Sequence, residues 1–133
     1  MIDEKDVVVT CDAQASVKTA VNIGEIELGR AKYLTIFGEW RAGRQGWPWY
    51  GPIGNGNGII GNSYAALVEV WLVKGKEEPE LLLKKLYQGS PMHIMNGYGK
   101  KIKVTVRMDD PGDLTDNEIN PNNPMRATLI EFK

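Results

Sequence analysis

The run from Lys101 to Met108 constrains the fold most strongly, because its apolar residues occupy every second position. Such alternation is typical of a β-strand that buries one face and exposes the other to solvent. Lys101, Lys103 and Arg107 then belong to the solvated face. This stretch therefore predicts a half-buried strand at the edge of an apolar core.

Other strand-like runs recur at short intervals, with glycines between them. Predicted strands cover residues 7–11, 16–23, 25–29, 33–37, 64–73 and 126–132. The segment from Glu77 to Leu86 has acids first, Pro79 near its start and lysines last, so it could form a helical turn; residues 81–87 otherwise look extended. The spacing indicates an all-β sandwich or barrel. The length of 133 residues and the 42% hydrophobic content fit one domain spanning residues 1–133.

A turn-rich loop follows the strand that ends at Met108. Its oxygen-bearing side chains include Asp109, Asp113, Asp116 and Asn117. The Pro111-Gly112 pair favours a tight turn that can direct them toward one point, as a calcium site requires. The alternating ligand pattern of an EF-hand is absent. Two interpretations stay open: an irregular calcium loop completed by oxygens from elsewhere in the chain, or an ordinary surface turn, which is made of the same residues.

The stretch from Arg41 to Gly61 is rich in Gly, Trp, Pro and Asn and predicts a long irregular loop. Residues 54–58 lack the Gly-Lys-Ser ending and the following helix of a phosphate-binding loop. Trp47, Trp49 and Tyr50 offer flat faces on which a sugar can stack, or they pin the loop to the core. Trp40 is the firmest core candidate among the tryptophans.

Several functional classes find little support. Sixteen basic and seventeen acidic residues give no global attraction to nucleic acid or to an anionic membrane. No apolar stretch is long enough for a membrane helix and no export signal is recognisable, so we expect a soluble protein, cytoplasmic or released without a classical signal peptide. The lone Cys11 and the lone His93 lie in apolar runs typical of core strands, and they lack zinc-ligand spacing. An enzyme is not expected.

Three motifs together resemble the PA-IL-like (LecA-type) galactophilic bacterial lectins. The loop resembles the family's calcium loop, Asn-Asp-Val-Pro-Gly-Thr-Tyr-Gly-Asn-Asn; without a gap, Asp109 falls on the Asp, Pro111-Gly112 on the Pro-Gly and Asp116-Asn117 on the Asn-Asn. Residues 34–40 and 46–52 are similar to the family's strand ending in Gly-Trp and its Tyr-Gly-Pro turn. Residues 66–70 are similar to its Gly-Ala-Leu-Val strand.

The resemblance implies a jelly-roll-like, galactose-binding-domain-like β-sandwich that binds galactose or galactosides through a bound Ca²⁺ and forms a homodimer or homotetramer. The implied Ca²⁺ ligands are the side chains of Asp109, Asp116 and Asn117 and the backbone carbonyls of Tyr50 and Asp113. The implied sugar contacts are Tyr50, Asp109, Asp110 through its backbone, Asp113, Asp116 and Asn117. The loop after Tyr50 is shorter than the family's and lacks its His and Gln, so Asn55 and Asn57 are the candidates to replace their hydrogen bonds to the sugar.

Two alternatives compete with a lectin. One is a calcium-stabilised β-sandwich that binds a protein partner or only itself and has no sugar site. The other is a hydrolase that uses a pair of carboxylates, although no pair in the sequence has a spacing that argues for it.

Overall fold

The computed structural model describes residues 7–14, 21–27, 32–42, 48–94, 101–110 and 117–132. These residues form strands and loops, and no helix occurs among them. The strands are β1 Val7–Gln14, β2 Val21–Glu27, β3 Lys32–Phe37, β4 Trp40–Arg41, β5 Ala66–Lys74, β6 Glu77–Leu86, β7 Met92–Ile94, β8 Lys101–Met108, β9 Glu118–Ile119 and β10 Arg126–Phe132. The predicted all-β class is therefore confirmed.

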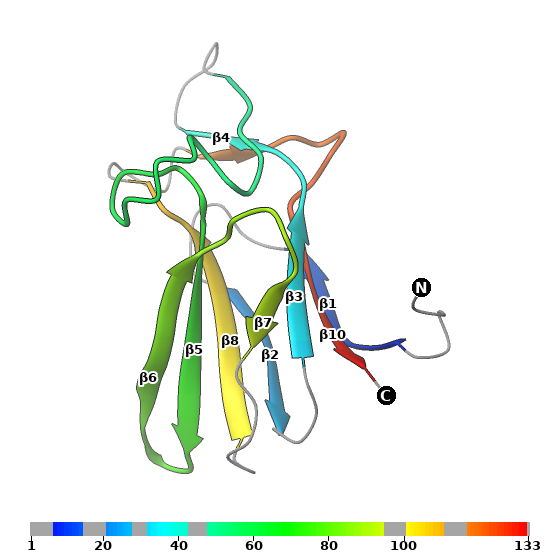
Figure 1. Cartoon of the computed structure of the whole chain (residues 1–133), viewed down its shortest axis with the longest axis vertical. Helices are drawn as coiled ribbons and strands as arrows, with labels where there is room; N and C mark the ends of the chain where they lie inside the picture. Colours follow the sequence, from blue (N-terminus) through cyan, green and yellow to red (C-terminus); the bar gives the residue numbers. More distant parts are fainter. Residues whose placement is uncertain are drawn as a thin grey trace.

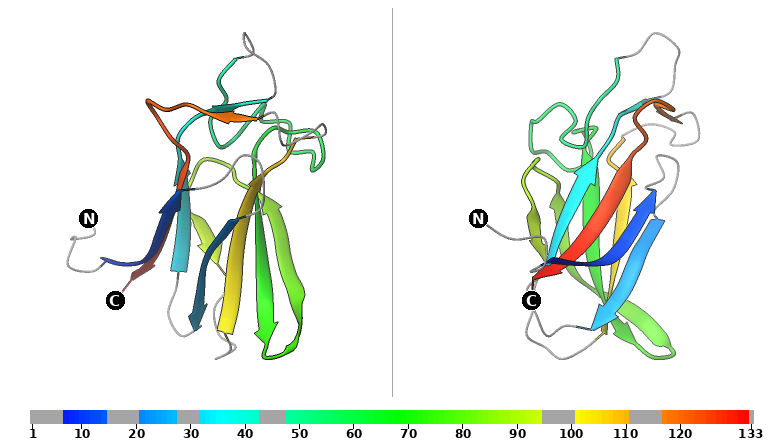
Figure 2. Two further views of the ribbon diagram at one scale, coloured as in Figure 1. Left: turned by 180° about the vertical axis from the view of Figure 1, so that it is seen from behind. Right: turned by 90° about the vertical axis from the view of Figure 1, so that its right-hand side faces the viewer.

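Two antiparallel sheets face each other as a sandwich (Figures 1 and 2). One has the strand order β1-β10-β3-β7 and the other β2-β8-β5-β6, with four described strands in each. The pairing is nested, since β1 pairs with β10, β2 with β8, β3 with β7 and β5 with β6. The connections after β3, β6 and β8 therefore emerge at one end of the sandwich, where the short pair of β4 and β9 also lies.

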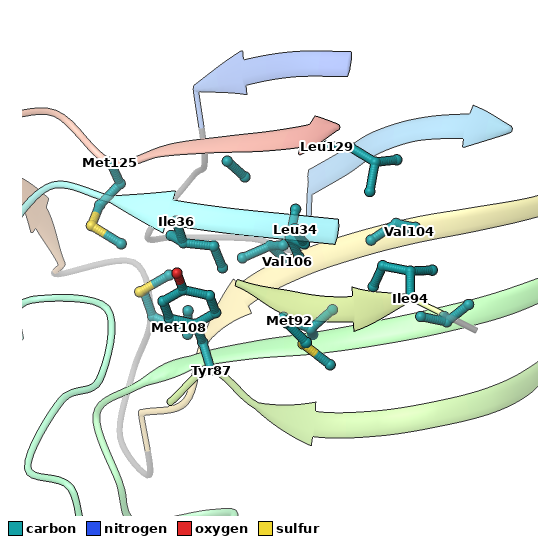
Figure 3. Packing of buried hydrophobic residues seen from close by; sticks show 14 of the residues in the cluster. Leu34, Ile36, Tyr87, Met92, Ile94, Val104, Val106, Met108, Met125 and Leu129 are labelled. Carbon is teal, nitrogen blue, oxygen red and sulfur yellow. The ribbon is translucent and has the colours of Figure 1, made fainter. Parts of the chain in front are cut away.

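The core lies between the inner faces of the two sheets (Figure 3). In β8 the buried and half-exposed residues alternate, and the four inward side chains have no exposed surface: Ile102, Val104, Val106 and Met108. Burying each such side chain contributes about 1.5 to 3 kcal/mol. On the outer face, the Arg107 guanidinium lies 3.3 Å from the Glu69 carboxylate and the Lys103 ammonium lies 5.8 Å from the Trp71 ring centre. The predicted half-buried strand with a charged solvent face is confirmed.

Other predicted strands agree with the structure to different degrees. The run 126–132 coincides with β10, and β3 begins one residue before the predicted run 33–37. The predicted runs 16–23 and 25–29 contribute to one strand, β2, whose register shifts between Asn22 and Gly24; residues 15–20 and 28–29 lie outside the described residues. In the short strand β7, Met92 and Ile94 are buried while His93 is exposed, as expected of a strand at the core.

The helical turn considered for residues 77–86 does not form, because these residues are strand β6. Gly75, with φ of +66°, turns the chain from β5 into β6, and the register from Leu67↔Leu86 to Lys74↔Glu77 joins the two strands. Pro79 is tolerated because β6 is an edge strand, where a missing N–H can face solvent. In the part of the chain that the structure describes, no helix is long and apolar enough to cross a membrane.

Replacing Gly38 with alanine should destabilise the fold strongly. Gly38 has φ of +119°, and a Cβ there would lie 2.4 Å from the Pro124 carbonyl oxygen and 2.5 Å from the Met125 Cα. Gly75→Ala is the matched control, since its φ is also positive but a Cβ would meet nothing within 4 Å. In urea unfolding we expect a loss of about 2 to 4 kcal/mol for Gly38→Ala and about 1 kcal/mol for Gly75→Ala. Equal losses would show that the close approach at Gly38 is unimportant.

Candidate functional site

Asp109 follows β8 directly and is held by backbone hydrogen bonds to the two residues that precede β5. Its N–H donates to the Ala65 carbonyl at 2.7 Å, and its carbonyl accepts from the Tyr64 N–H at 2.9 Å. Asp109 as a whole is 3% exposed. It accepts from the Gly61 N–H at 2.9 Å (Oδ1) and 2.8 Å (Oδ2), and through Oδ2 from the Ser63 N–H at 3.2 Å and the Ser63 hydroxyl at 2.6 Å. These donors stabilise a charge that would otherwise be costly to bury.

The loop of residues 51–63 is thereby attached to the end of β8. Its own asparagines give it internal order: the Asn55 and Asn57 side-chain amides both donate to the Asn62 carbonyl, at 3.1 and 2.9 Å. Their side-chain oxygens accept from the backbone N–H groups of Asn57 and Ile59. Gly54, with φ of +59°, lies so close to the backbone of residues 63–64 that no Cβ would fit. Asn55 and Asn57 therefore shape the loop, whether or not they also meet a ligand.

Three aromatic rings pack against one another, and two of them, Tyr50 and Tyr64, directly flank this loop in sequence. The Tyr50 and Tyr64 rings stack with centres 5.5 Å apart and an interplanar angle of 11°, and the Trp40 ring lies 6.2 and 6.3 Å from them. Trp40 has no exposed surface, which confirms its predicted place in the core. The Trp40 backbone N–H donates to the Tyr50 carbonyl at 2.9 Å, and the Tyr50 backbone N–H donates to the Trp40 carbonyl at 2.7 Å. Tyr50 is thus held by both its ring and its backbone.

The same contacts bring several predicted site residues to one end of the sandwich. Tyr50 reaches Asp109 through Tyr64, which stacks on Tyr50 and bonds to the Asp109 carbonyl. Trp40 also pairs with Ile119 in β9, which places the fully buried Asn117, two residues earlier, at this end. Asp110 is half-buried beside Asp109. Asp113 and Asp116 lie outside the described residues, as do Pro111 and Gly112.

The described oxygen donors fit a calcium ion in type. Calcium binds carboxylate, amide and carbonyl oxygens. Oδ1 of Asp109 accepts a hydrogen bond from the Gly61 N–H, and the Tyr50 carbonyl accepts one from the Trp40 backbone N–H; each such oxygen has two lone pairs. Within the described ranges there is no group of three or more His, Cys, Asp or Glu side chains placed to hold a metal ion. A complete calcium shell would therefore need further oxygens, and the candidates Asp113 and Asp116 lie outside the described residues.

The predicted aromatic stacking faces are partly taken up by protein contacts. Tyr50 packs against Tyr64 and the core, and the Arg41 guanidinium lies 4.5 Å from the centre of the Trp49 ring. Arg41 is itself held by Glu118, whose carboxylate accepts from its Nε at 2.9 Å and Nη2 at 2.6 Å. These contacts favour the reading in which the aromatic residues fix the loops. Trp47 lies outside the described residues.

A pocket of about 440 Å³ adjoins the loop and was not foreseen from the sequence. It is lined by Ile53, Gly56, Gly58, Ile60, Ser63, Ala65 and residues 84–88 of β6 and its end. Ser63 connects it to Asp109, since the Ser63 hydroxyl donates to that carboxylate. Its volume lies within the range of small-molecule sites. The sequence signal was the set of isoleucines in a polar loop: Ile53, Ile59 and Ile60 are all about half exposed.

Cys11 and His93 do not form a nucleophile–base pair. Cys11 lies in β1 and His93 in β7, at opposite edges of one sheet, with β10 and β3 between them. Three strand spacings separate such residues by roughly 14 Å. His93 instead lies against Tyr33, with ring centres 5.2 Å apart.

Replacing Ser63 with alanine should weaken the attachment of the loop to β8. The substitution removes the 2.6 Å hydrogen bond to a buried carboxylate and the acceptor for the Ala65 N–H. We expect a loss of about 1.5 to 3 kcal/mol in chemical unfolding and faster amide exchange in residues 51–63. The control is Ser90→Ala at an exposed position, which should change neither. If Ser63→Ala changed neither the free energy of unfolding nor the amide exchange, the backbone amides alone would hold the carboxylate.

Comparison with known proteins adds no relative. No family model, no curated protein and no solved structure matched the chain. The functional reading therefore depends on the chain's own motifs and on the geometry of this end of the sandwich.

Proposed function

We propose that the chain is a calcium-dependent carbohydrate-binding module that recognises galactose or a galactoside and does not turn it over. The observation that carries the proposal is the convergence of Tyr50, Asp109 and Asn117, distant in sequence, at one end of the sandwich. The motif resemblance in the loop 108–117 supports the same site. The nested strand pairing supports the jelly-roll form of the sandwich.

Calcium would supply a cation whose open coordination positions take two neighbouring sugar hydroxyls, so that it selects the hydroxyl pair. The chain would hold the ion with the side chains of Asp109, Asp116 and Asn117 and the carbonyls of Tyr50 and Asp113. The backbone of Asp110 and the amides of Asn55 and Asn57 would contact the sugar. Gly61 and Ser63 hold the Asp109 carboxylate in a fixed orientation, so its remaining lone pairs would already face the ion. This would lower the conformational entropy lost when calcium binds.

A second candidate function is a structural or protein-interaction sandwich without a sugar site. The hydrogen bonds to Asp109 favour it, because they satisfy the buried carboxylate without a cation. In that case the acidic loop after Met108 is an ordinary surface turn. The two candidates differ in what the protein binds, which makes them separable by experiment.

Thermal unfolding of metal-stripped protein tests the proposed function. Calcium at 100 times its dissociation constant should add about 2.7 kcal/mol to the unfolding free energy and so raise the midpoint. Galactose, but not glucose, should raise it again in the presence of calcium and have no effect in its absence. A calcium response without any sugar response would favour the second candidate. If calcium did not raise the unfolding midpoint, the proposed calcium site would be contradicted.

Removing one proposed ligand sharpens the test. Asp116→Asn keeps the shape of the side chain and removes its charge, so calcium affinity measured by titration calorimetry should fall by about 10 to 100-fold. Glu80→Gln is the matched control, because it makes the same change at an exposed position of β6, where the Glu80 carboxylate lies 3.8 Å from the Lys74 ammonium. Equal calcium affinities in the two variants would contradict the proposed coordination by Asp116.

A further inference from the structure

Strand β6 forms one edge of its sheet. Within the described residues it pairs with β5 on one side and with no strand on the other. The front and back views both show it as the outermost ribbon of the sheet β2-β8-β5-β6 (Figures 1 and 2). Its residues 77–81 and 84–85 are exposed. A long strand with an open backbone edge is a template for pairing with another chain.

The charges of β6 are separated along its length. Glu77 and Glu78 stand at the start and Lys84 and Lys85 near the end, with Pro79, Glu80 and three leucines between them. Throughout the described part of the chain, no hydrogen bond or ion pair involves these four side chains. A second copy of the strand running in the opposite direction presents its lysines to these glutamates. The strand is therefore complementary in charge to its own reversed copy.

We propose that a second copy of this chain binds here, through antiparallel pairing of the two β6 strands about a two-fold axis at Leu81. In that register Glu77 lies opposite the partner's Lys85 and Glu78 opposite the partner's Lys84, and the symmetry repeats both pairs. Leu81, which is 42% exposed, lies opposite its own copy, and this contact removes part of its apolar surface from water. Parallel pairing would instead set like charges side by side.

The irregularities of β6 preserve this register. In the pairing of β6 with β5, the step from residue 83 to 81 in β6 is matched by the single step from residue 70 to 71 in β5. Likewise, the three steps from residue 80 to 77 in β6 are matched by the two steps from residue 72 to 74 in β5. Each irregularity therefore adds one residue to β6, and the two lie on either side of Leu81. A two-fold axis at Leu81 sets residues 81–83 of one copy opposite residues 79–81 of its partner, so the two irregularities overlap without coinciding. Glu77 and Lys85 are each separated from the axis by the same number of residues and by one irregularity, so this outer charge pair stays aligned.

The same strand can be read as an edge that is protected from pairing, since edge strands often carry lysines and proline. Pro79 does remove one ladder donor from β6. Protection by charge requires that two copies repel, as they do when the charges share one sign. Here the acids and the lysines occupy opposite halves, so one antiparallel register is attractive. The charge order distinguishes the two readings, and it favours a defined dimer.

Sedimentation and light scattering on the whole chain give the first test. We expect a mass of twice 14.8 kDa at the higher end of a range of roughly 1 to 500 µM, with dissociation on dilution. Raising the salt concentration to about 1 M should weaken the dimer, because it screens exposed charge pairs. A protein that stays monomeric over the whole range overturns the proposal.

Charge exchange gives the second test. The variants Glu77→Lys/Glu78→Lys and Lys84→Glu/Lys85→Glu should each raise the dimer dissociation constant by on the order of 100-fold, because like charges then lie opposite each other. Mixing the two variants restores every pair between unlike copies, so a heterodimer should form. Lys103→Glu, on the outer face of β8, is a charge control that should leave the dimer intact.

These results separate the proposed surface from any other. If both charge-reversed variants remain dimeric, the interface lies elsewhere. If both are monomeric and their mixture is also monomeric, the antiparallel register is wrong. Circular dichroism and urea unfolding check that each variant is folded, and the salt dependence of the unaltered protein tests the charge pairs without any substitution.

Discussion

The buried carboxylate of Asp109 is the interaction on which the loop end of this sandwich depends. It joins the end of β8 to Gly61 and Ser63, and its backbone continues the ladder to residues 64 and 65. An ionised carboxylate is costly to bury unless several donors surround it. In the observed arrangement, residues 51–63 supply these donors through Gly61 and Ser63. Asp109 therefore fixes the loop, and the loop in turn keeps Asp109 out of water.

Asp109 can act both as a structural group and as a calcium ligand. As a structural group, Asp109 accepts enough hydrogen bonds to be stable without an ion. As a ligand, it would offer a rigid oxygen at the start of an acidic loop. The two roles are compatible, because among the described residues Oδ2 accepts from Gly61 and from both groups of Ser63, whereas Oδ1 accepts from Gly61 alone. The loss of calcium binding in an Asp109 variant would thus not separate ligation from loop collapse, whereas a change at Asp116 touches the proposed ligand set without removing these hydrogen bonds.

The strands were predictable where the signal is local. In β8 every second residue is apolar, and its bounds follow from the sequence; β10 is equally clear. In β6 the acid-first, lysine-last order resembles a helix, and the pairing with β5 through the Gly75 turn decides for a strand. The candidate site was harder to predict from the sequence. The bonds from Gly61 and Ser63 to Asp109 span 48 and 46 positions, and nothing in Ser63 itself distinguishes it from other loop serines. The pocket depends on the same long-range closure.

The two proposals have a joint geometric consequence, which depends on the proposed function of the loop end. A two-fold axis perpendicular to β6 reverses the direction of the strands, so the loop ends of the two copies point in opposite directions. Two sites on such a dimer cannot bind one flat glycan surface together, and avidity of that kind requires that both sites engage at once. They can instead connect two separate surfaces. A dimer through β6 would therefore make a calcium-dependent lectin a cross-linking protein.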